Sequence, residues 1–387
     1  MMGTAPRSKR FRHGMVMVAM LAAMCGAARA SDWFPPFPTC PTYPLTHVPM
    51  WSILTNAGYL CFVGQPPVQP STTTFLTPLV PIIVKLKASD GSVEFVSDPR
   101  KPLFVNPTNN DSLSAWDAAL GSPIFNTHDY KLGSTKLGTL QWGEMTEKAS
   151  FWKYPGANFD NWFVELAVFP GLPEALEVPS GSWSGVAGEV HGYAVDAAVM
   201  DPFLKKLAEK TPLATPIFLT YNIGTYSIGQ NQTPQCCAYG YHKAYVEDYY
   251  TNFYIWASYM DPPSGRPDVL GLSHEVAEFM HDPFLTNFVQ QYPNPGSFKL
   301  PWNPPYTFTN CKYDLEVADP LEDRLGEPSE AQIKIKNSIM EYHLQNVVTA
   351  SWLMQANPSF SVNGWYTLKG AVDGEFAAPA PLCSTTP

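Results

Sequence analysis

The stretch LGLSHEVAEFMHDPF, residues 270–284, has the pattern of a helix with two different faces. At 100° per residue, its apolar side chains fall on one side and its ionisable side chains on the other. The apolar side consists of Val269, Leu272, Val276, Phe279 and Met280, and the ionisable side is centred on His274, Glu278 and His281. We therefore expect a helix over residues 268–281, with one face in the core and the other available to a ligand.

The ionisable face carries the pattern HExxE, a variant of the HExxH pattern of zinc metallopeptidases. His274 and Glu278 are one helical turn apart, so both side chains can reach one metal ion. Glu275, one residue further round the helix, is placed to act as a general base on water. A solvated helix face that happens to carry two histidines and two glutamates is the alternative interpretation.

An acidic segment, DLEVAD at residues 314–319, follows about 40 residues after the HExxE pattern. Its Glu316 and Asp319 are one helical turn apart. Glu316 can supply a third metal ligand, and Asp319 can hydrogen-bond His274 and so fix the tautomer of its ring. An acidic turn without a ligand is the alternative, because further acidic residues come shortly after it.

The rest of the chain mixes strand and helix patterns, which predicts an α+β fold. Apolar, β-branched runs predict strands over residues 79–86, 216–223 and 249–260. Helical patterns cover residues 138–152, 201–210 and 341–355. In the first of these helices we expect a solvated side formed by Glu144, Thr146, Glu147 and Lys148, and in the second we expect Asp201 as N-cap with Pro202 at the first position. The 39 prolines predict many loops.

Residues 1–30 have the three parts of a secretory signal peptide. A basic cluster at residues 7–12 precedes an apolar run at residues 14–26, and Ala28-Arg29-Ala30 forms a cleavage site of small residues. We therefore expect the mature protein to be secreted or periplasmic. Residues 31–387 are expected to form a single domain, in which the proline-rich residues 31–74 form an irregular N-terminal wrap.

Six cysteines remain after residue 30: Cys40, Cys61, Cys236, Cys237, Cys311 and Cys383. An even number in an exported protein predicts three disulfides, whose pairing the sequence leaves open. Because Cys236 and Cys237 are adjacent, we expect them to pair with two different distant partners. The sequence has no CxxC pair, which argues against a cysteine zinc site.

The charge balance argues against nucleic-acid binding. The net charge is −10, and without the five basic residues of the first 30 the chain has 34 acidic against 19 basic residues. Such a surface repels phosphate backbones and favours cations. No apolar run after residue 30 reaches the ~18 residues that cross a bilayer, so we expect no membrane span. The oligomeric state is left open.

Other catalytic classes have less support in the sequence. The segment GSWSG at residues 181–185 places Trp183 where a GxSxG nucleophile elbow requires serine. No glycine pattern for binding phosphate or a dinucleotide is present. The 11 tryptophans and 19 tyrosines could line a sugar cleft beside two carboxylates, as in glycosidases, but core packing explains most of them.

Together these segments resemble the gluzincin branch of zinc metallopeptidases, in which an HExxE or HExxH helix is followed by an ExxD-type helix. Three segments are similar to the sequences of a group of secreted bacterial zincin-like proteins: SHEVAEFMHDPF, CCAYGYHKAY at residues 236–245 and LEVADPL at residues 315–321. They are more distantly similar to plant exordium or phosphate-induced proteins. The resemblance covers residues 210–325 and implies a zincin-like core, a mixed sheet with an active-site helix, within proline-rich loops and disulfides.

Carried over position by position, the resemblance implies His274 and Glu316 as metal ligands and Glu275 as general base. Glu278 departs from the pattern, and we expect it to be the second ligand. A His-Glu-Glu site with Zn²⁺ is formally neutral, whereas His-His-Glu is positive, so water at this site would be acidified less. The expected cofactor is Zn²⁺ or another divalent metal, and the expected partner is a peptide or protein substrate.

Two further histidines have supporting roles in this hypothesis. His242 precedes the aromatic strand and could hydrogen-bond a substrate or a transition-state oxyanion. A structural imidazole beside Cys236 and Cys237 is the alternative. His281 lies about 10.5 Å along the helix axis from His274, so one ion can hardly bind both, and we place His281 around the ligands and not among them.

Two functions are consistent with these observations. The leading hypothesis is a secreted metal-dependent hydrolase of the zinc metallopeptidase type, in which the HExxE helix and a downstream glutamate hold the metal. The alternative is an exported binding or surface protein that keeps a zincin-like scaffold without catalysis.

Overall fold

The structure is a computed structural model of the 387-residue chain. It describes residues 40, 45–55, 58–105, 112–186, 192–228, 234–247, 250–261, 266–293, 311–322, 332–336, 340–370 and 376–377, and all of them belong to one compact unit, Phe37–Pro387. The predicted signal peptide, residues 1–30, lies outside the described residues, and so does Cys383. The described chain is a mixed α+β structure made mostly of strands.

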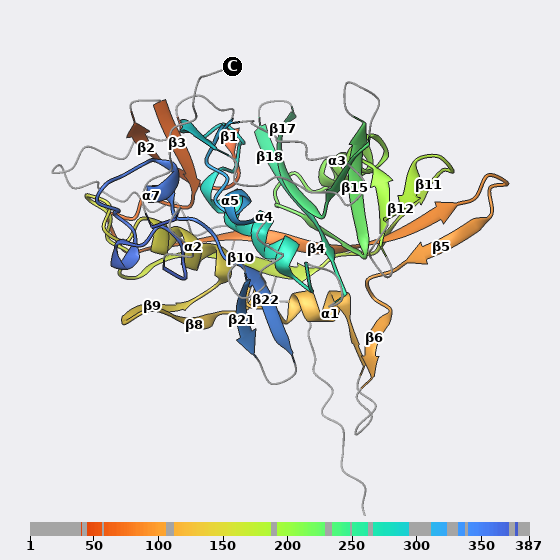
Figure 1. Cartoon of the computed structure of the whole chain (residues 1–387), viewed down its shortest axis with the longest axis horizontal. Helices are drawn as coiled ribbons and strands as arrows, with labels where there is room; N and C mark the ends of the chain where they lie inside the picture. Colours follow the sequence, from red (N-terminus) through yellow and green to blue (C-terminus); the bar gives the residue numbers. More distant parts are fainter. Residues whose placement is uncertain are drawn as a thin grey trace, which may run out of the picture. The chain divides into compact units, whose positions relative to one another are not determined.

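A mixed sheet forms the centre of this unit (Figure 1). Its parallel strands are, in spatial order, β1 (Leu45–Thr46), β18 (Tyr250–Tyr259), β14 (Ile217–Tyr221), β4 (Ser71–Lys87) and β10 (Trp162–Pro170). Three strands lie off this path: β17 (Gly240–Glu247) is antiparallel to β18, while β11 (Glu174–Val178) and β5 (Val93–Ser97) pair with the second half of β4.

The strands predicted from apolar runs are confirmed as β14 and β18, and the third run is part of β4. β4 is much longer than predicted, with 17 residues. Its first half, STTTFLTP, alternates buried and exposed positions and is rich in threonine. Threonine is common in strands but is not apolar. A prediction based on apolar runs therefore places the start of this strand too far along the chain.

Smaller sheets surround the central one. A four-stranded sheet contains β12 (Trp183–Gly185), β13 (Tyr193–Asp196), β15 (Ile223–Ile228) and β16 (Pro234–Ala238). Five strand pairs complete the described sheets: β2 (Met50–Thr55) with β3 (Gly58–Val63), β6 (Pro102–Val105) with β7 (Ser112–Ser114), β8 (His128–Leu132) with β9 (Thr135–Leu140), β19 (Phe288–Pro293) with β20 (Cys311–Asp314), and β21 (Gln332–Lys336) with β22 (Glu341–Gln345).

The N-terminal segment expected to be irregular contains the β2–β3 hairpin, which a disulfide between Cys40 and Cys61 ties to the preceding chain. Cys237 is also disulfide-bonded. The side chains of Cys236 and Cys311 lie outside the described part of the structure.

The helix predicted over residues 341–355 is wrong. Residues 341–345 form β22, and only α7 (Ala350–Leu353) is helical in that range. Glu341 is exposed, Tyr342 is buried, His343 is half-buried and Leu344 is buried, which is the two-residue period of a strand. β21 pairs antiparallel with this strand, and the side chains of Asp268 and Ser273 accept hydrogen bonds from its N–H groups at His343 and Gln345.

Helix α4 (Leu270–His281) confirms the helix predicted from the two-faced pattern. It packs against β17, β18 and β22 and against α2 (Trp142–Ser150). Both of its faces are buried: His274, Glu275 and Glu278 are 8%, 5% and 3% exposed. The ionisable residues therefore do not form an ordinary solvated helix face.

The solvated side predicted for α2 is wrong, because Glu144, Thr146, Glu147 and Lys148 are all buried. The helix is enclosed by α4 on one side, where Val276 and Met280 lie against Gly143. On another side the Trp51 indole N–H of β2 donates a hydrogen bond to Glu147 at 2.8 Å. A distant partner thus accommodates a carboxyl group that local sequence would place in water.

Helix α3 (Ala197–Ala208) begins earlier than predicted. Asp196 is the N-cap and accepts a hydrogen bond from the N–H of Ala198, so Asp201 and Pro202 lie inside the helix. Asp201 instead accepts hydrogen bonds from Lys243 and Tyr254 of the neighbouring strands. The other short helices are α1 (Ala115–Leu120), α5 (Asp319–Glu322) and the 3₁₀ turn η2 (Val362–Gly364).

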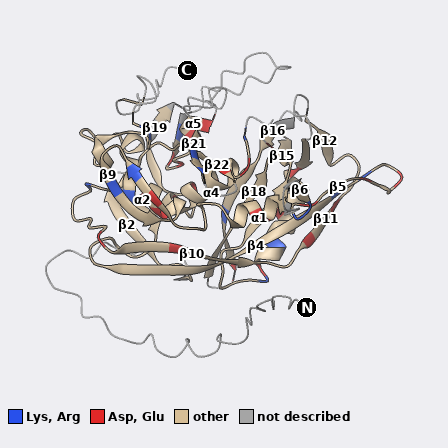
Figure 2. Cartoon of the chain, turned by 90° about the horizontal axis from the view of Figure 1, so that it is seen from below, with Lys and Arg blue, Asp and Glu red and all other residues tan. Residues whose placement is uncertain are grey.

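Charged residues are sparse along the ribbon, and Figure 2 shows acidic positions on both α2 and α5. Among the described helices, none has the length and apolarity that a membrane crossing requires.

Candidate metal centre

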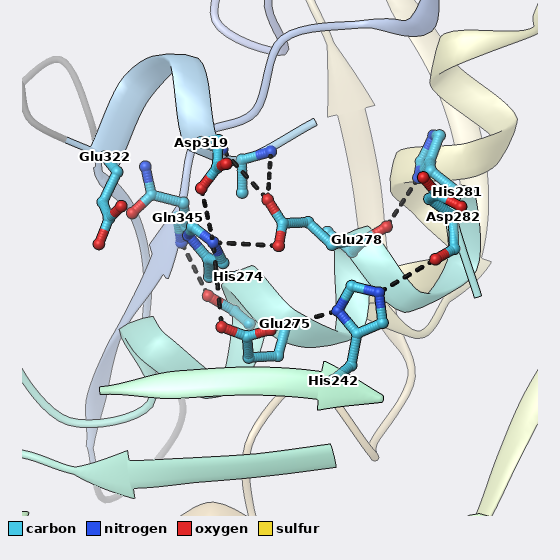
Figure 3. Close-up of polar contacts among 12 residues, drawn as sticks. His242, His274, Glu275, Glu278, His281, Asp282, Asp319, Glu322 and Gln345 are labelled. Atoms are coloured by element: carbon cyan, nitrogen blue, oxygen red, sulfur yellow. Dashed lines mark hydrogen bonds and ion pairs between the residues drawn. The ribbon is translucent and has the colours of Figure 1, made fainter. Parts of the chain in front are cut away.

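Three side chains from α4 and α5 converge on one point. His274 Nε2 lies 3.2 Å from Glu278 Oε2 and 3.6 Å from Asp319 Oδ1 (Figure 3). Ligands about 2.1 Å from a tetrahedral ion are about 3.4 Å from one another. The three groups therefore fit one divalent cation, and buried His and Glu donors with a half-buried Asp are donors that such ions bind.

Asp319 lies at ligand distance from His274 and not at the hydrogen-bond distance that the sequence predicted. We expected a hydrogen bond from the His274 ring, but 3.6 Å is too long for one and matches the spacing of two ligands of the same ion. The second carboxylate oxygen of Asp319, Oδ2, contacts the Lys312 ammonium group of β20. Lys312 thereby orients Asp319 so that Oδ1 faces His274.

Backbone amides of the α5 turn hold Glu278 in place. Its Oε1 accepts hydrogen bonds from the N–H groups of Ala318 and Asp319, both at 3.2 Å, so Oε2 is left to face His274. Burial by itself raises the pKa of Glu278, but the charges of His274 and His242 and the hydrogen bonds from His274 and Glu316 together outweigh it and lower the pKa to about 2. Glu278 is therefore a carboxylate at any neutral pH.

His274 carries a proton where a cation would bind. Burial by itself lowers the pKa of His274. The charge of Glu278, its hydrogen bond to His274 and the charge of Glu275 together outweigh burial and raise the pKa to about 9. A cation at this point has to displace that proton, because both would occupy the Nε2 lone pair. Binding of an ion should consequently release a proton at neutral pH.

Glu275 lies between two histidines. Its Oε1 is 3.9 Å from His274 Nε2, and its Oε2 is 3.4 Å from His242 Nδ1. His242 Nε2 donates a hydrogen bond to the carbonyl of Asp282 at 3.0 Å, since a carbonyl can only accept. Strand β17 therefore delivers His242 to Glu275 in a fixed ring orientation, and the alternative of a histidine beside Cys236 involves a side chain outside the described residues.

Glu316 lines the same cavity as His274 and Glu278. It is 7% exposed, and its Oε1 has no hydrogen-bond partner in the described structure. Burial, followed by the charge of Glu278, raises the pKa of Glu316 well above its usual range. The structure thus brings Glu316 to the site, and Asp319 lies at ligand distance from His274; ligation by Glu316 stays a prediction.

His281 is directed away from the other ionisable groups of α4. Its Nδ1 donates a hydrogen bond to the Ala277 carbonyl at 2.7 Å, and its Nε2 accepts one from the Ser150 hydroxyl at 3.1 Å. Burial lowers its pKa to about 4, so the ring is neutral. Nδ1 is bound within α4 and Nε2 joins α4 to α2, so both ring nitrogens have a structural role.

The site opens into a cavity of about 330 Å³ formed by β17, α4 and α5. Two residues that sequence reasoning missed also line it, Arg266 and Gln345. Arg266 pairs with Glu322 at 2.8 Å and lies over the Tyr239 ring. Gln345 is fixed by its backbone N–H, which donates to Ser273 Oγ of α4 at 2.8 Å. No local pattern marks either residue, because each reaches the cavity through a tertiary contact.

Comparison with protein-family models, curated proteins and solved structures found no match for this chain. The resemblance to zincin-like and exordium proteins therefore stays a prediction, and the function is argued from the geometry of the site.

Proposed function

We propose that this protein is an exported, metal-dependent hydrolase of the zinc metallopeptidase type that cleaves a peptide or a related amide. The observation that supports this most is the convergence of His274, Glu278 and Asp319 on one point of the cavity wall, with Glu275 beside it. A secreted or periplasmic location follows from the N-terminal sequence pattern and is part of the same proposal.

The reaction needs a Lewis acid and a base close together. A divalent cation held by His274, Glu278 and Asp319 would polarise the scissile carbonyl and acidify water. Zn²⁺ is our first choice, although a site with one histidine and two carboxylates also suits harder divalent ions.

Glu275 is the residue placed to take a proton from water. Its Oε1 faces His274 Nε2 across 3.9 Å, so a water molecule between the cation position and Glu275 lies within reach of this oxygen. His242 holds the other oxygen, Oε2, and is itself held by the Asp282 carbonyl. The pair fixes the carboxylate so that the proton taken up at Oε1 points back into the cavity.

A catalytically inactive binding or surface protein is the second candidate. It is favoured by the completeness of the contacts around Glu278, which pairs with His274 and accepts two backbone N–H groups. In such a cluster the charges are paired and hydrogen-bonded without a cation. Metal content separates the two candidates.

The test compares Glu275→Gln with the wild-type mature chain on a library of fluorogenic peptides. Glu144→Gln is the matched control, because Glu144 is also a buried helical glutamate but lies on α2. We expect Glu275→Gln to lose about 10²–10⁴-fold in rate while the ion at His274 is retained, and Glu144→Gln to keep its rate. A Glu275→Gln variant with the full wild-type rate would show that Glu275 is not the base.

A further inference from the structure

A second group of potential ligands lies next to the first and shares Glu278 with it. It consists of His242 from β17 and Glu275 and Glu278 from α4, and one donor atom from each lies within 4.8 Å of the others. All three residues are buried. The first group reaches α5 through Asp319, and the second reaches β17 through His242 (Figure 3).

The spacing in this second group also matches an ion. His242 Nδ1 and Glu275 Oε2 are 3.4 Å apart, which is long for a hydrogen bond and equal to the separation of two ligands about 2.1 Å from a tetrahedral ion. The hydrogen bond from His242 Nε2 to the Asp282 carbonyl fixes the ring so that Nδ1 faces Glu275. Protein carbonyls commonly orient metal-binding histidines in this way, and an ion at Nδ1 would replace the proton that Nδ1 otherwise shares with Glu275.

An independent observation comes from Glu316. Its side chain is more than nine-tenths buried and lines the same cavity, yet its Oε1 has no hydrogen-bond partner among the described residues. A buried carboxyl oxygen without a partner is costly, and a cation removes the cost. It is a spare oxygen donor at a site that already holds three acids.

We propose that the site is a two-ion centre, in which His274 and Asp319 hold one divalent cation, His242 Nδ1 and Glu275 Oε2 hold the second, and Glu278 is shared. This inference deepens the proposed function, since paired ions about 3.5–4 Å apart stabilise both the attacking and the leaving oxygen of a hydrolysis. Glu275 Oε1 stays free in this arrangement, so the carboxylate binds with one oxygen and accepts a proton with the other.

The test is the number of ions bound, measured without any substrate. The oxidised mature chain is stripped with a chelator, titrated with Zn²⁺ and separately with Mn²⁺, desalted, and measured by elemental analysis. We expect two equivalents in the wild type and one in His242→Ala. His281→Ala is the matched control, because His281 is equally buried and both its ring nitrogens are used elsewhere; it should bind two.

The spectrum of the Mn²⁺ form gives a second readout that needs no variant. Two manganese ions sharing a carboxylate give an exchange-coupled electron paramagnetic resonance signal, whereas isolated ions give the six-line pattern. If His242→Ala does not fold, as judged by circular dichroism, Glu275→Gln replaces it and should also bind one equivalent.

The outcomes separate this inference from the proposed function. One equivalent in the wild type, unchanged in His242→Ala, would overturn the second position and leave the single-ion hydrolase intact. Two equivalents in both proteins would overturn the assignment of His242. No bound ion in a folded wild type would overturn the two-ion centre and the proposed function together.

Discussion

Replacing Gly240 by alanine should displace Glu275, because these two residues touch where β17 meets α4. A Cβ atom added to Gly240 would lie 2.6 Å from Glu275 Cγ and 2.7 Å from Glu275 Oε1, whereas ordinary contacts begin near 3.4 Å. Glu275 would have to shift by about 0.8 Å in a site where it is 5% exposed. Overpacking of this kind costs about 1–3 kcal/mol of stability.

The same shift should impair catalysis more than folding. A displacement of a catalytic group by about 1 Å can lower the rate about 10²-fold. His274 and Asp319 are not in the contact, so the ion bound by them should remain. Gly185→Ala is the matched control, because Gly185 also lies on a strand and a Cβ there meets nothing within 4 Å.

The assay has two parts, urea unfolding of the mature protein and the hydrolysis rate on a peptide that the wild type cleaves. We expect Gly240→Ala to unfold at lower urea and to lose rate, while Gly185→Ala stays within about 0.5 kcal/mol of the wild type. Equal stability and equal rate for Gly240→Ala and Gly185→Ala would refute the placement of Glu275 against β17.

Three further predictions concern other parts of the molecule. Burial raises the pKa of Glu144 to about 8, so the folded state binds the proton of Glu144 more tightly than the unfolded state does. The unfolding free energy of the wild type therefore falls as the pH rises from about 4.5 to about 8. Glu144→Gln should therefore gain stability relative to the wild type between pH 5 and pH 8, by about 2 kcal/mol or more in urea unfolding; a constant difference would show that Glu144 ionises normally. Replacing both Cys40 and Cys61 by alanine opens a loop with a sequence separation of 21. It should lower the free energy of unfolding by about 3 kcal/mol in the same assay. An unchanged urea midpoint would contradict this prediction. Asp319→Asn should weaken Zn²⁺ binding, measured by competition with a chelating dye, more than Glu316→Gln does; the reverse order would make Glu316 the third ligand.

Local patterns predicted the elements that their own residues determine. The two-faced period of residues 268–281 predicted α4, and the dense aromatic run predicted β18. His274 and Glu278 come together for the same reason, since a spacing of four residues places them on one side of any helix.

What the sequence could not predict depends on partners far along the chain. The burial of Glu147 depends on Trp51, which is 96 residues away. The position of Asp319 depends on the N–H groups of Ala318 and Asp319 that bind Glu278 across a separation of 40 and 41 residues. The pattern within one segment carries no information about such contacts. From the sequence we therefore predicted that Asp319 hydrogen-bonds His274 and does not bind the ion itself.

The most direct test of the account is to locate the ion. Crystals of the mature protein grown with Zn²⁺ would be measured above and below the zinc absorption edge, and the anomalous difference map would be calculated. We predict a peak about 2.1 Å from His274 Nε2 that is also within bonding distance of Glu278 and Asp319. A map without a peak at His274, in which His274 and Glu278 remain paired with each other, would contradict the metal centre.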